Sequence, residues 1–119
     1  MSTLVFVYGT LKRGFSNHSR LAGQKYLGPA RTVPGFRLFE LDGFPALVAW
    51  PEDRAGVVGE VWSVDRDQLL KLDVFEGVQE GMYRREPIAL QSPFAQSTVY
   101  AYFAGRPTLG REIGSTWEE

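Results

Sequence analysis

Short runs of apolar residues, several of them alternating with polar ones, recur along the chain and are separated by Gly, Pro or Asp. Runs of this kind are typical of β-strands bounded by turns. They predict strands at residues 4–8, 35–41, 46–50, 57–64, 83–90 and 98–103, with a weaker candidate at 25–33. Many short strands with frequent turns favour a twisted, barrel-like sheet.

Residues 65–77 break this pattern. Asp65 is a candidate N-cap, Asp67 places an acidic side chain in the first turn, and Gly77 is a C-terminal stop. The segment contains strong helix formers and no proline. We therefore predict an α-helix over residues 65–76 that packs against the bent sheet.

The whole chain, residues 1–119, is expected to form a single α+β domain, a small mixed β-barrel or strongly bent sheet with flanking helices. At 119 residues the chain can bury a core without metal or disulfide staples. A short helix is expected near residues 17–23. Residues 105–119 are polar and interrupted by Gly and Pro, so we expect a tail that wraps around the domain or frays.

Two acidic residues of the predicted helix fall on its apolar side. At about 100° per residue, Glu76 lies between Leu72 and Leu69, and Asp73 lies on the other side of Leu69. Acidic side chains are rarely buried without a partner or a function. Glu76 also lies in the last turn, so both desolvation and the helix dipole raise its pKa. A carboxylate of this kind can move a proton near neutral pH.

A structural interpretation of the same two residues stays open. Glu76 could pair with Arg84 or Arg85, and Asp73 could accept a hydrogen bond from the backbone of a turn. Structural ion pairs perturb carboxylates as catalytic sites do. Periodicity therefore does not decide between the two interpretations.

The first strand ends in Tyr-Gly-Thr-Leu, residues 8–11, followed at once by Lys12 and Arg13. Gly9 permits a positive φ and close approach of a ligand to the backbone, and such a corner can aim consecutive N–H groups at an anion. The spacing imitates a phosphate-binding P-loop, but the Lys-Ser or Lys-Thr of that motif is missing, so nucleotide hydrolysis is a poor interpretation. The alternative is a plain turn with solvated basic residues.

Composition narrows the chemistry further. The formal net charge of −1 argues against a nucleic-acid partner. Cysteine is absent and His18 is the single histidine, so neither thiolate chemistry nor a metal site is expected. His18 lies in a polar stretch and is expected to cap a helix or lie at the surface. No membrane-spanning run and no signal peptide are evident, so we expect no membrane association and a cytoplasmic location.

Four motifs in order along the chain resemble the gamma-glutamylcyclotransferase superfamily, most closely its gamma-glutamylamine cyclotransferase branch. They are VFVYGTLKRG followed by NH, then GEVWSVD, LDVFEG and YRRE. The resemblance spans residues 4 to about 103. It implies a small mixed barrel with flanking helices.

The resemblance also implies a reaction and a site. Enzymes of this type cleave a gamma-glutamyl amide by letting the substrate's own α-amine attack the γ-carbonyl, which releases 5-oxoproline and a free amine without cofactor or metal. The implied partner is a small-molecule gamma-glutamyl substrate. Matched position by position, Tyr8, Gly9, Thr10 and Leu11 cradle the glutamyl group, and Glu76 carries out the acid–base chemistry.

We further expect Tyr83 to form a wall or hydrogen-bond partner of the site, and Asp73 to be structural. Two other functions stay open. The chain could be a non-catalytic small-molecule binding module, or a cyclotransferase for a gamma-glutamyl group attached to a carrier protein or antibiotic precursor. The sequence predicts neither the leaving amine nor the oligomeric state.

Overall fold

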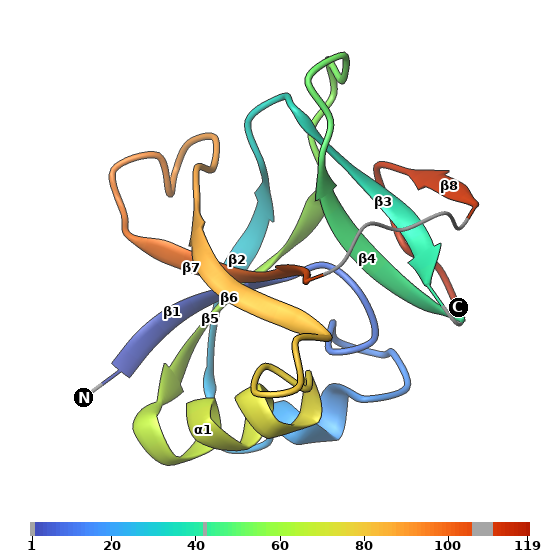
Figure 1. Ribbon diagram of the computed structural model, residues 1–119. Helices are drawn as coiled ribbons and strands as arrows, with labels where there is room; N and C mark the ends of the chain where they lie inside the picture. Colours follow the sequence, from blue (N-terminus) through green and yellow to red (C-terminus); the bar gives the residue numbers. More distant parts are fainter. Residues whose placement is uncertain (1, 42, 106–110) are drawn as a thin grey trace.

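Eight strands and one α-helix make up the fold in a computed structural model that describes residues 2–41, 43–105 and 111–119 (Figure 1). The elements are β1 (Ser2–Val7), a 3₁₀ helix η1 (His18–Leu21), β2 (Lys25–Arg31), β3 (Phe36–Leu41), β4 (Phe44–Ala49), β5 (Val58–Asp65), α1 (Arg66–Phe75), β6 (Tyr83–Ile88), β7 (Val99–Ala104) and β8 (Glu112–Gly114). The mixed, strongly bent sheet with its packed helix confirms the predicted α+β fold class.

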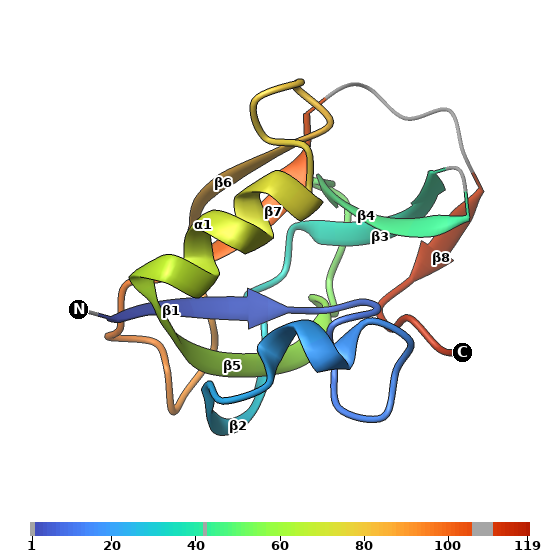
Figure 2. The ribbon, with the colours of Figure 1, turned by 90° about the horizontal axis from the view of Figure 1, so that it is seen from below.

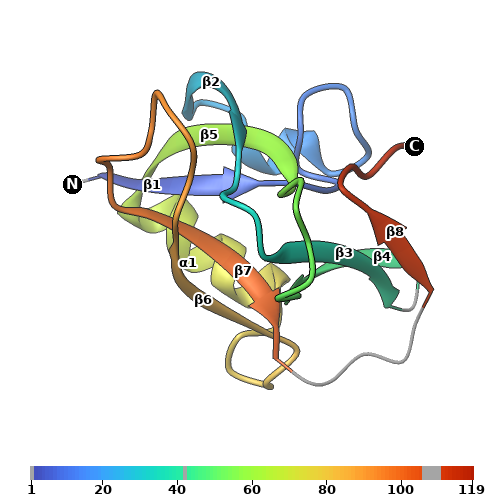
Figure 3. The ribbon, with the colours of Figure 1, turned by 90° about the horizontal axis from the view of Figure 1, so that it is seen from above.

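The strands form a single sheet in the order β2-β5-β1-β7-β4-β3-β8, and β6 pairs with β7. Strand β7 therefore has three partners. Antiparallel β6 pairs along its whole length, whereas β1 and β4 both run parallel to it. β1 pairs at Val99 and Tyr100, and β4 pairs at Phe103. β1 pairs with the start of β7 and β4 with its end, so the sheet is split between β1 and β4 along this edge of β7. The chain that leaves β1 turns away from β7 (Figure 3).

Helix α1 covers one face of the sheet beside β1 and β5 (Figure 2). The Asp65 side chain accepts a hydrogen bond from the Gln68 backbone N–H at 2.8 Å, which confirms the predicted N-cap. Gly77, with φ of +65°, ends the helix as predicted. The side chain of Leu72, in α1, is completely buried. The predicted short helix at 17–23 is a single 3₁₀ turn, η1.

Two apolar clusters form the core, one on each face of the sheet. Val5 and Val7 of β1 belong to the cluster beneath α1, whereas Phe6 belongs to the cluster inside the bend. The predicted alternation of strand side chains produces this division, since successive residues point to opposite faces. On β5, Val61 and Trp62 are separated in the same way.

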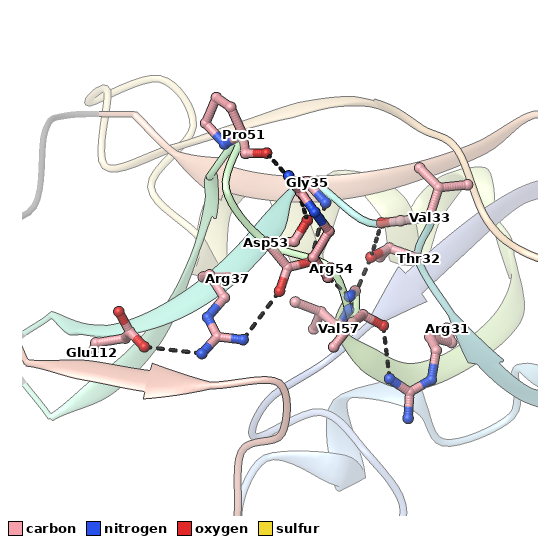
Figure 4. Close-up of polar contacts among 12 residues, drawn as sticks. Arg31, Thr32, Val33, Gly35, Arg37, Pro51, Asp53, Arg54, Val57 and Glu112 are labelled. Atoms are coloured by element: carbon pink, nitrogen blue, oxygen red, sulfur yellow. Dashed lines mark hydrogen bonds and ion pairs between the residues drawn. The ribbon is translucent and has the colours of Figure 1, made fainter.

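A buried carboxylate, which the sequence analysis did not single out, joins two strand ends (Figure 4). Asp53 Oδ2 accepts hydrogen bonds from the backbone N–H groups of Gly35 and Gly56 at 3.0 and 2.7 Å, and Oδ1 pairs with Arg37 at 3.0 Å. Burial alone would raise the pKa of Asp53, but these donors lower it to about 2. Asp53 thereby anchors the loop before β5 to the start of β3.

The predicted tail at 105–119 is docked where the structure describes it, while residues 106–110 lie outside the described ranges. Strand β8, which was not predicted, pairs with β3. The backbone N–H of Val58 donates to the Ser115 carbonyl at 2.9 Å. No helix within residues 2–41, 43–105 and 111–119 is long and apolar enough to cross a membrane.

Candidate active site

A cavity of about 240 Å³ opens at the split beside β7. Its walls come from the end of β1 and the loop that follows it, the end of β3, the start of β4, the end of α1, β6 and β7. The lining residues are Phe6, Val7, Tyr8, Gly9, Thr10, Leu11, Leu41, Phe44, Pro45, Phe75, Glu76, Gly77, Met82, Tyr83 and Tyr102. All six residues predicted for the site therefore line one cavity.

Glu76 occupies the C-cap of α1, where its backbone N–H still donates to the Leu72 carbonyl at 2.8 Å. Its side chain is partly buried at the cavity wall. Burial raises the pKa of Glu76 from its ordinary 4.5 to about 7, with Arg20 opposing the rise and Asp73 adding to it. The carboxyl group is thus poised to accept and return a proton near neutral pH.

The alternative that Glu76 forms an ion pair with Arg84 or Arg85 is wrong for the residues that the structure describes. Arg85 pairs with Asp73 at 2.9 Å and Arg84 pairs with Glu86 at 2.9 Å, and neither contacts Glu76. In the described ranges the Glu76 carboxylate has no ion pair and no hydrogen bond. The side-chain carboxylate of Asp73 does not bond to the backbone of a turn, as the alternative had it, but holds the side chain of Arg85 on β6.

Residues 9–11 line the cavity directly after Tyr8. Within the part of the chain that the structure describes, Gly9, Thr10 and Leu11 donate no backbone hydrogen bond, although the Gly9 carbonyl accepts one from the Lys12 N–H at 3.1 Å. Free N–H groups in a buried turn are suited to an anionic or carbonyl oxygen. The φ angle of Gly9 is not in the positive range, so this freedom of glycine does not explain the residue at position 9.

Close packing explains the glycine at position 9. A Cβ added to Gly9 would lie 2.4 Å from Pro45 Cγ, a separation that real side chains do not reach. Pro45 belongs to β4, so the glycine lets the loop after β1 lie against the strand that takes over the pairing with β7. Because Gly9 has no side chain, the loop and β4 lie in contact, and together they form this wall of the cavity.

Three tyrosines line the cavity with their hydroxyl groups hydrogen-bonded within the protein. Tyr8 donates to the Tyr102 carbonyl at 2.6 Å, Tyr83 to the Pro45 carbonyl at 3.0 Å, and Tyr102 to Asp73 Oδ1 at 2.6 Å. Burial raises the pKa of both Tyr8 and Tyr102 well above the usual range. Tyr8 and Tyr102 therefore stay protonated at neutral pH, and the three hydrogen bonds fix the walls of the cavity.

The loop after Leu11 is braced from two sides. Lys12 is 7% exposed, and its Nζ donates to the Trp117 carbonyl at 2.9 Å and lies 4.5 Å from the centre of the Phe15 ring. His18 Nδ1 lies 3.1 Å from the Leu11 carbonyl. A plain turn with solvated basic residues is therefore wrong for Lys12, and His18 contacts the loop instead of capping a helix.

The sequence analysis missed several residues of the cavity wall. They are Phe6, Val7, Leu41, Phe44, Pro45, Phe75, Gly77, Met82 and Tyr102. Most are apolar residues of strand or helix ends, which sequence alone assigns to the core. Only the order of the strands around β7 shows that they border a cavity. No group of three or more His, Cys, Asp and Glu side chains suited to a metal occurs among the described residues.

The fold and the cavity together define a small mixed-sheet protein with a partly buried acid beside a loop of free backbone N–H groups. Residues 5–119 match the family described as "Gamma-glutamyl cyclotransferase, AIG2-like". The chain belongs to this family, as its motifs predicted.

Relatives and solved structures support this membership. A putative gamma-glutamylcyclotransferase from Vibrio cholerae is 42% identical over 102 residues, covering 86% of this chain and 84% of the relative. A gamma-glutamylaminecyclotransferase from Rattus norvegicus is 36% identical over 94 residues, covering 73% of this chain and 62% of the relative. The crystal structure of an AIG2-like protein from Mus musculus superposes with a TM-score of 0.79 at 29% identity, covering 91% of this chain and 80% of that chain.

Proposed function

We propose that this protein is a gamma-glutamyl cyclotransferase that acts on a gamma-glutamyl amine or amide. The α-amine nitrogen of the substrate attacks the γ-carbonyl carbon, a C–N bond forms within the glutamyl group, and the original amide C–N bond breaks. The products are 5-oxoproline and a free amine. The nucleophile belongs to the substrate, so the protein supplies positioning, proton transfer and stabilisation of the oxyanion.

In this proposal Glu76 is the general acid and base. The α-ammonium group loses one proton before the nitrogen attacks and a second as the ring amide forms. Both protons end on the leaving nitrogen, which departs as an ammonium ion. A carboxyl group with a pKa of about 7 exchanges protons in both directions at neutral pH.

The loop at 8–11 is proposed to hold the glutamyl group. The N–H groups of Gly9, Thr10 and Leu11 would donate to the substrate carboxylate or to the oxyanion of the tetrahedral intermediate. Tyr8 and Tyr83 would form the walls that keep the glutamyl chain bent, a geometry that can supply several kcal/mol of the barrier.

One observation carries the proposal. An acid without an ion pair among the described residues, whose pKa burial raises to about 7, lines the same cavity as backbone N–H groups that donate to no described residue. A purely structural acid would be expected to have a partner, as Asp73 does. The names of the relatives agree in general terms with an activity of this kind.

The test is mass spectrometry for 5-oxoproline after incubation with a panel of gamma-glutamyl amines, amino acids and peptides. Reactions without protein control for spontaneous cyclisation. Release of 5-oxoproline with the matching amine in equal amount supports the proposal. If high protein concentrations release no product from any of the compounds, the protein is no cyclotransferase for free small substrates, and calorimetric titration with 5-oxoproline then tests the binding-module alternative.

A further inference from the structure

Arg20 lies on η1 beside the end of α1. Its guanidinium carbon is 3.8 Å from the centre of the Phe75 ring, a distance typical of a cation–π contact. Phe75 precedes Glu76 and lines the cavity. The guanidinium therefore stacks on the residue next to Glu76, at the C-terminal end of the helix.

The position of Arg20 is held by its backbone as well as by its side chain. The Arg20 carbonyl accepts a hydrogen bond from the side-chain amide of Gln68 on α1. Among residues 2–41, 43–105 and 111–119, the guanidinium of Arg20 forms no ion pair. Its charge is permanent at any pH at which the protein is folded, and within the described residues no carboxylate in direct contact neutralises it.

We propose that Arg20 is a positioning residue for Glu76, which holds a fixed positive charge beside the carboxylate and keeps it available as a base. This inference rests on the proposed function, because it concerns the proton-transfer step of that reaction. Arg20 does not line the cavity, so it acts through Glu76 and does not contact the substrate.

The other groups around Glu76 cannot supply this charge. Asp73, one turn earlier on α1, is negative and opposes ionisation of Glu76. Arg85 on β6 is engaged by Asp73 in a pair with two hydrogen bonds, at 2.9 and 3.1 Å. Tyr8 after β1 and Tyr102 on β7 are neutral, and the ionised form of Glu76 raises the pKa of each in addition to the effect of burial.

Arg20 therefore lowers the pKa of Glu76, whereas burial and Asp73 raise it. Burial raises the pKa of Glu76, and the Arg20 charge limits that rise. Without the arginine, less of the enzyme would carry an ionised Glu76 at pH 6 to 7, and less could accept the proton of the α-ammonium group. The consequence is confined to the acid side of the pH profile, because Glu76 is fully ionised at high pH in either case.

The experiment compares the pH profiles of kcat/KM for the wild type, Arg20→Gln and Arg20→Lys, with the best substrate of the panel. Arg20→Gln removes the charge and is expected to move the acid limb to higher pH. Activity at pH 6 should fall about three- to tenfold, and activity at pH 9 should stay within about twofold, since one pH unit corresponds to a factor of ten. Arg20→Lys keeps the charge and should stay close to the wild type.

Arg84→Gln is the matched control. Arg84 also lies over an aromatic ring, 5.5 Å from the centre of Phe103, but it pairs with Glu86 and does not line the cavity. This variant should leave the acid limb in place. An acid limb that is unchanged in Arg20→Gln, a loss that is equal at all pH values, or an equal shift in Arg20→Lys would overturn the inference.

A second measurement separates this inference from the proposed function. The carboxyl carbon of Glu76, observed by NMR in labelled protein, reports its titration without any substrate. If the wild type releases no 5-oxoproline but Arg20→Gln moves this titration to higher pH, the proposed function fails and the coupling between Arg20 and Glu76 stands. If the protein is active and the titration does not move, the role of Arg20 is refuted and the function stands.

Discussion

Asp73 lies in the last turn of α1 and Glu76, three positions later, is its C-cap, yet only Asp73 has an ion-pair partner among the described residues, Arg85 at 2.9 Å. The Asp73 carboxylate also accepts a hydrogen bond from the Tyr102 hydroxyl at 2.6 Å. Asp73 therefore connects the helix to β6 and β7, while the carboxylate of Glu76 stays available in the cavity. This difference leads to opposite expectations for the two neutral variants.

Glu76→Gln keeps the size of the side chain and removes its ability to carry a proton. We expect kcat to fall by at least about 100-fold, the lower end for loss of a general acid–base group. The fold should persist, because a neutral amide is easier to bury than a carboxylate. Steady-state kinetics of 5-oxoproline release tests this expectation. Near-normal turnover would refute the proton-transfer role of Glu76.

Asp73→Asn should behave in the opposite way. The change removes the charge that holds Arg85 and weakens the hydrogen bond from Tyr102, so we expect a loss of about 1 to 3 kcal/mol in the free energy of unfolding. Turnover per folded molecule should change far less than in Glu76→Gln. Urea unfolding and kinetics on the same preparation measure both quantities. An unchanged stability would show that the ion pair contributes little.

The raised pKa of Glu76 also makes stability depend on pH. The folded protein binds the proton more tightly than the unfolded chain, so the free energy of unfolding should decrease as pH rises from about 4.5 to about 7. After a discount for partial exposure, the loss is on the order of 2 kcal/mol. It should be absent in Glu76→Gln. Urea unfolding of both proteins between pH 4 and 8 provides the comparison, and parallel curves would contradict the raised pKa.

Gly9→Ala tests the contact with β4. The new Cβ would lie 2.4 Å from Pro45 Cγ, so either the loop or the strand must move. We expect a loss of about 1 to 3 kcal/mol in stability, typical of overpacking, together with a higher KM. Pro45→Ala removes the colliding atom, so the double variant should recover part of both losses relative to Gly9→Ala. No recovery would place the cause elsewhere.

Asp53→Asn tests the polar anchor of Figure 4. An amide binds Gly35, Gly56 and Arg37 less well than a carboxylate, so stability should fall by about 2 to 4 kcal/mol. Because folding lowers the pKa of Asp53 from 3.8 to about 2, its contribution is present above pH 4 and is lost as pH falls toward 2. Denaturant unfolding at pH 6 and pH 2.5 measures this, with the exposed Asp67→Asn as control. Equal losses for the two variants would contradict the role of Asp53.

Local patterns predicted the strands and the helix because each depends on neighbouring residues. The N-cap at Asp65 and the stop at Gly77 were read from side-chain types within one turn, and both are confirmed. The three-residue strand β8 was missed, since it has no apolar alternation of its own and forms only by pairing with β3.

Tertiary arrangement limited the prediction of the site. The position of Glu76 on the helix indicated an unusual acid, but which acid Arg85 would pair with depends on how β6 lies against α1. The burial of Lys12 could not be foreseen, because basic residues are usually solvated and its partner, the Trp117 carbonyl, is distant in sequence. The role of Pro45 required knowledge that β4 adjoins the end of β1.

The hydrogen bond between Lys12 and Trp117 joins residues that are 105 positions apart. Contacts of such long range are slow to form, because the intervening chain must be ordered before the two groups can meet. During synthesis, β1 cannot pair until β5 and β7 have been made. The loop at 9–11 is braced by the Lys12–Trp117 hydrogen bond only after residue 117 has left the ribosome. The nascent chain can therefore complete this brace of the cavity wall only after strands β1 to β8 of the sheet have been synthesised.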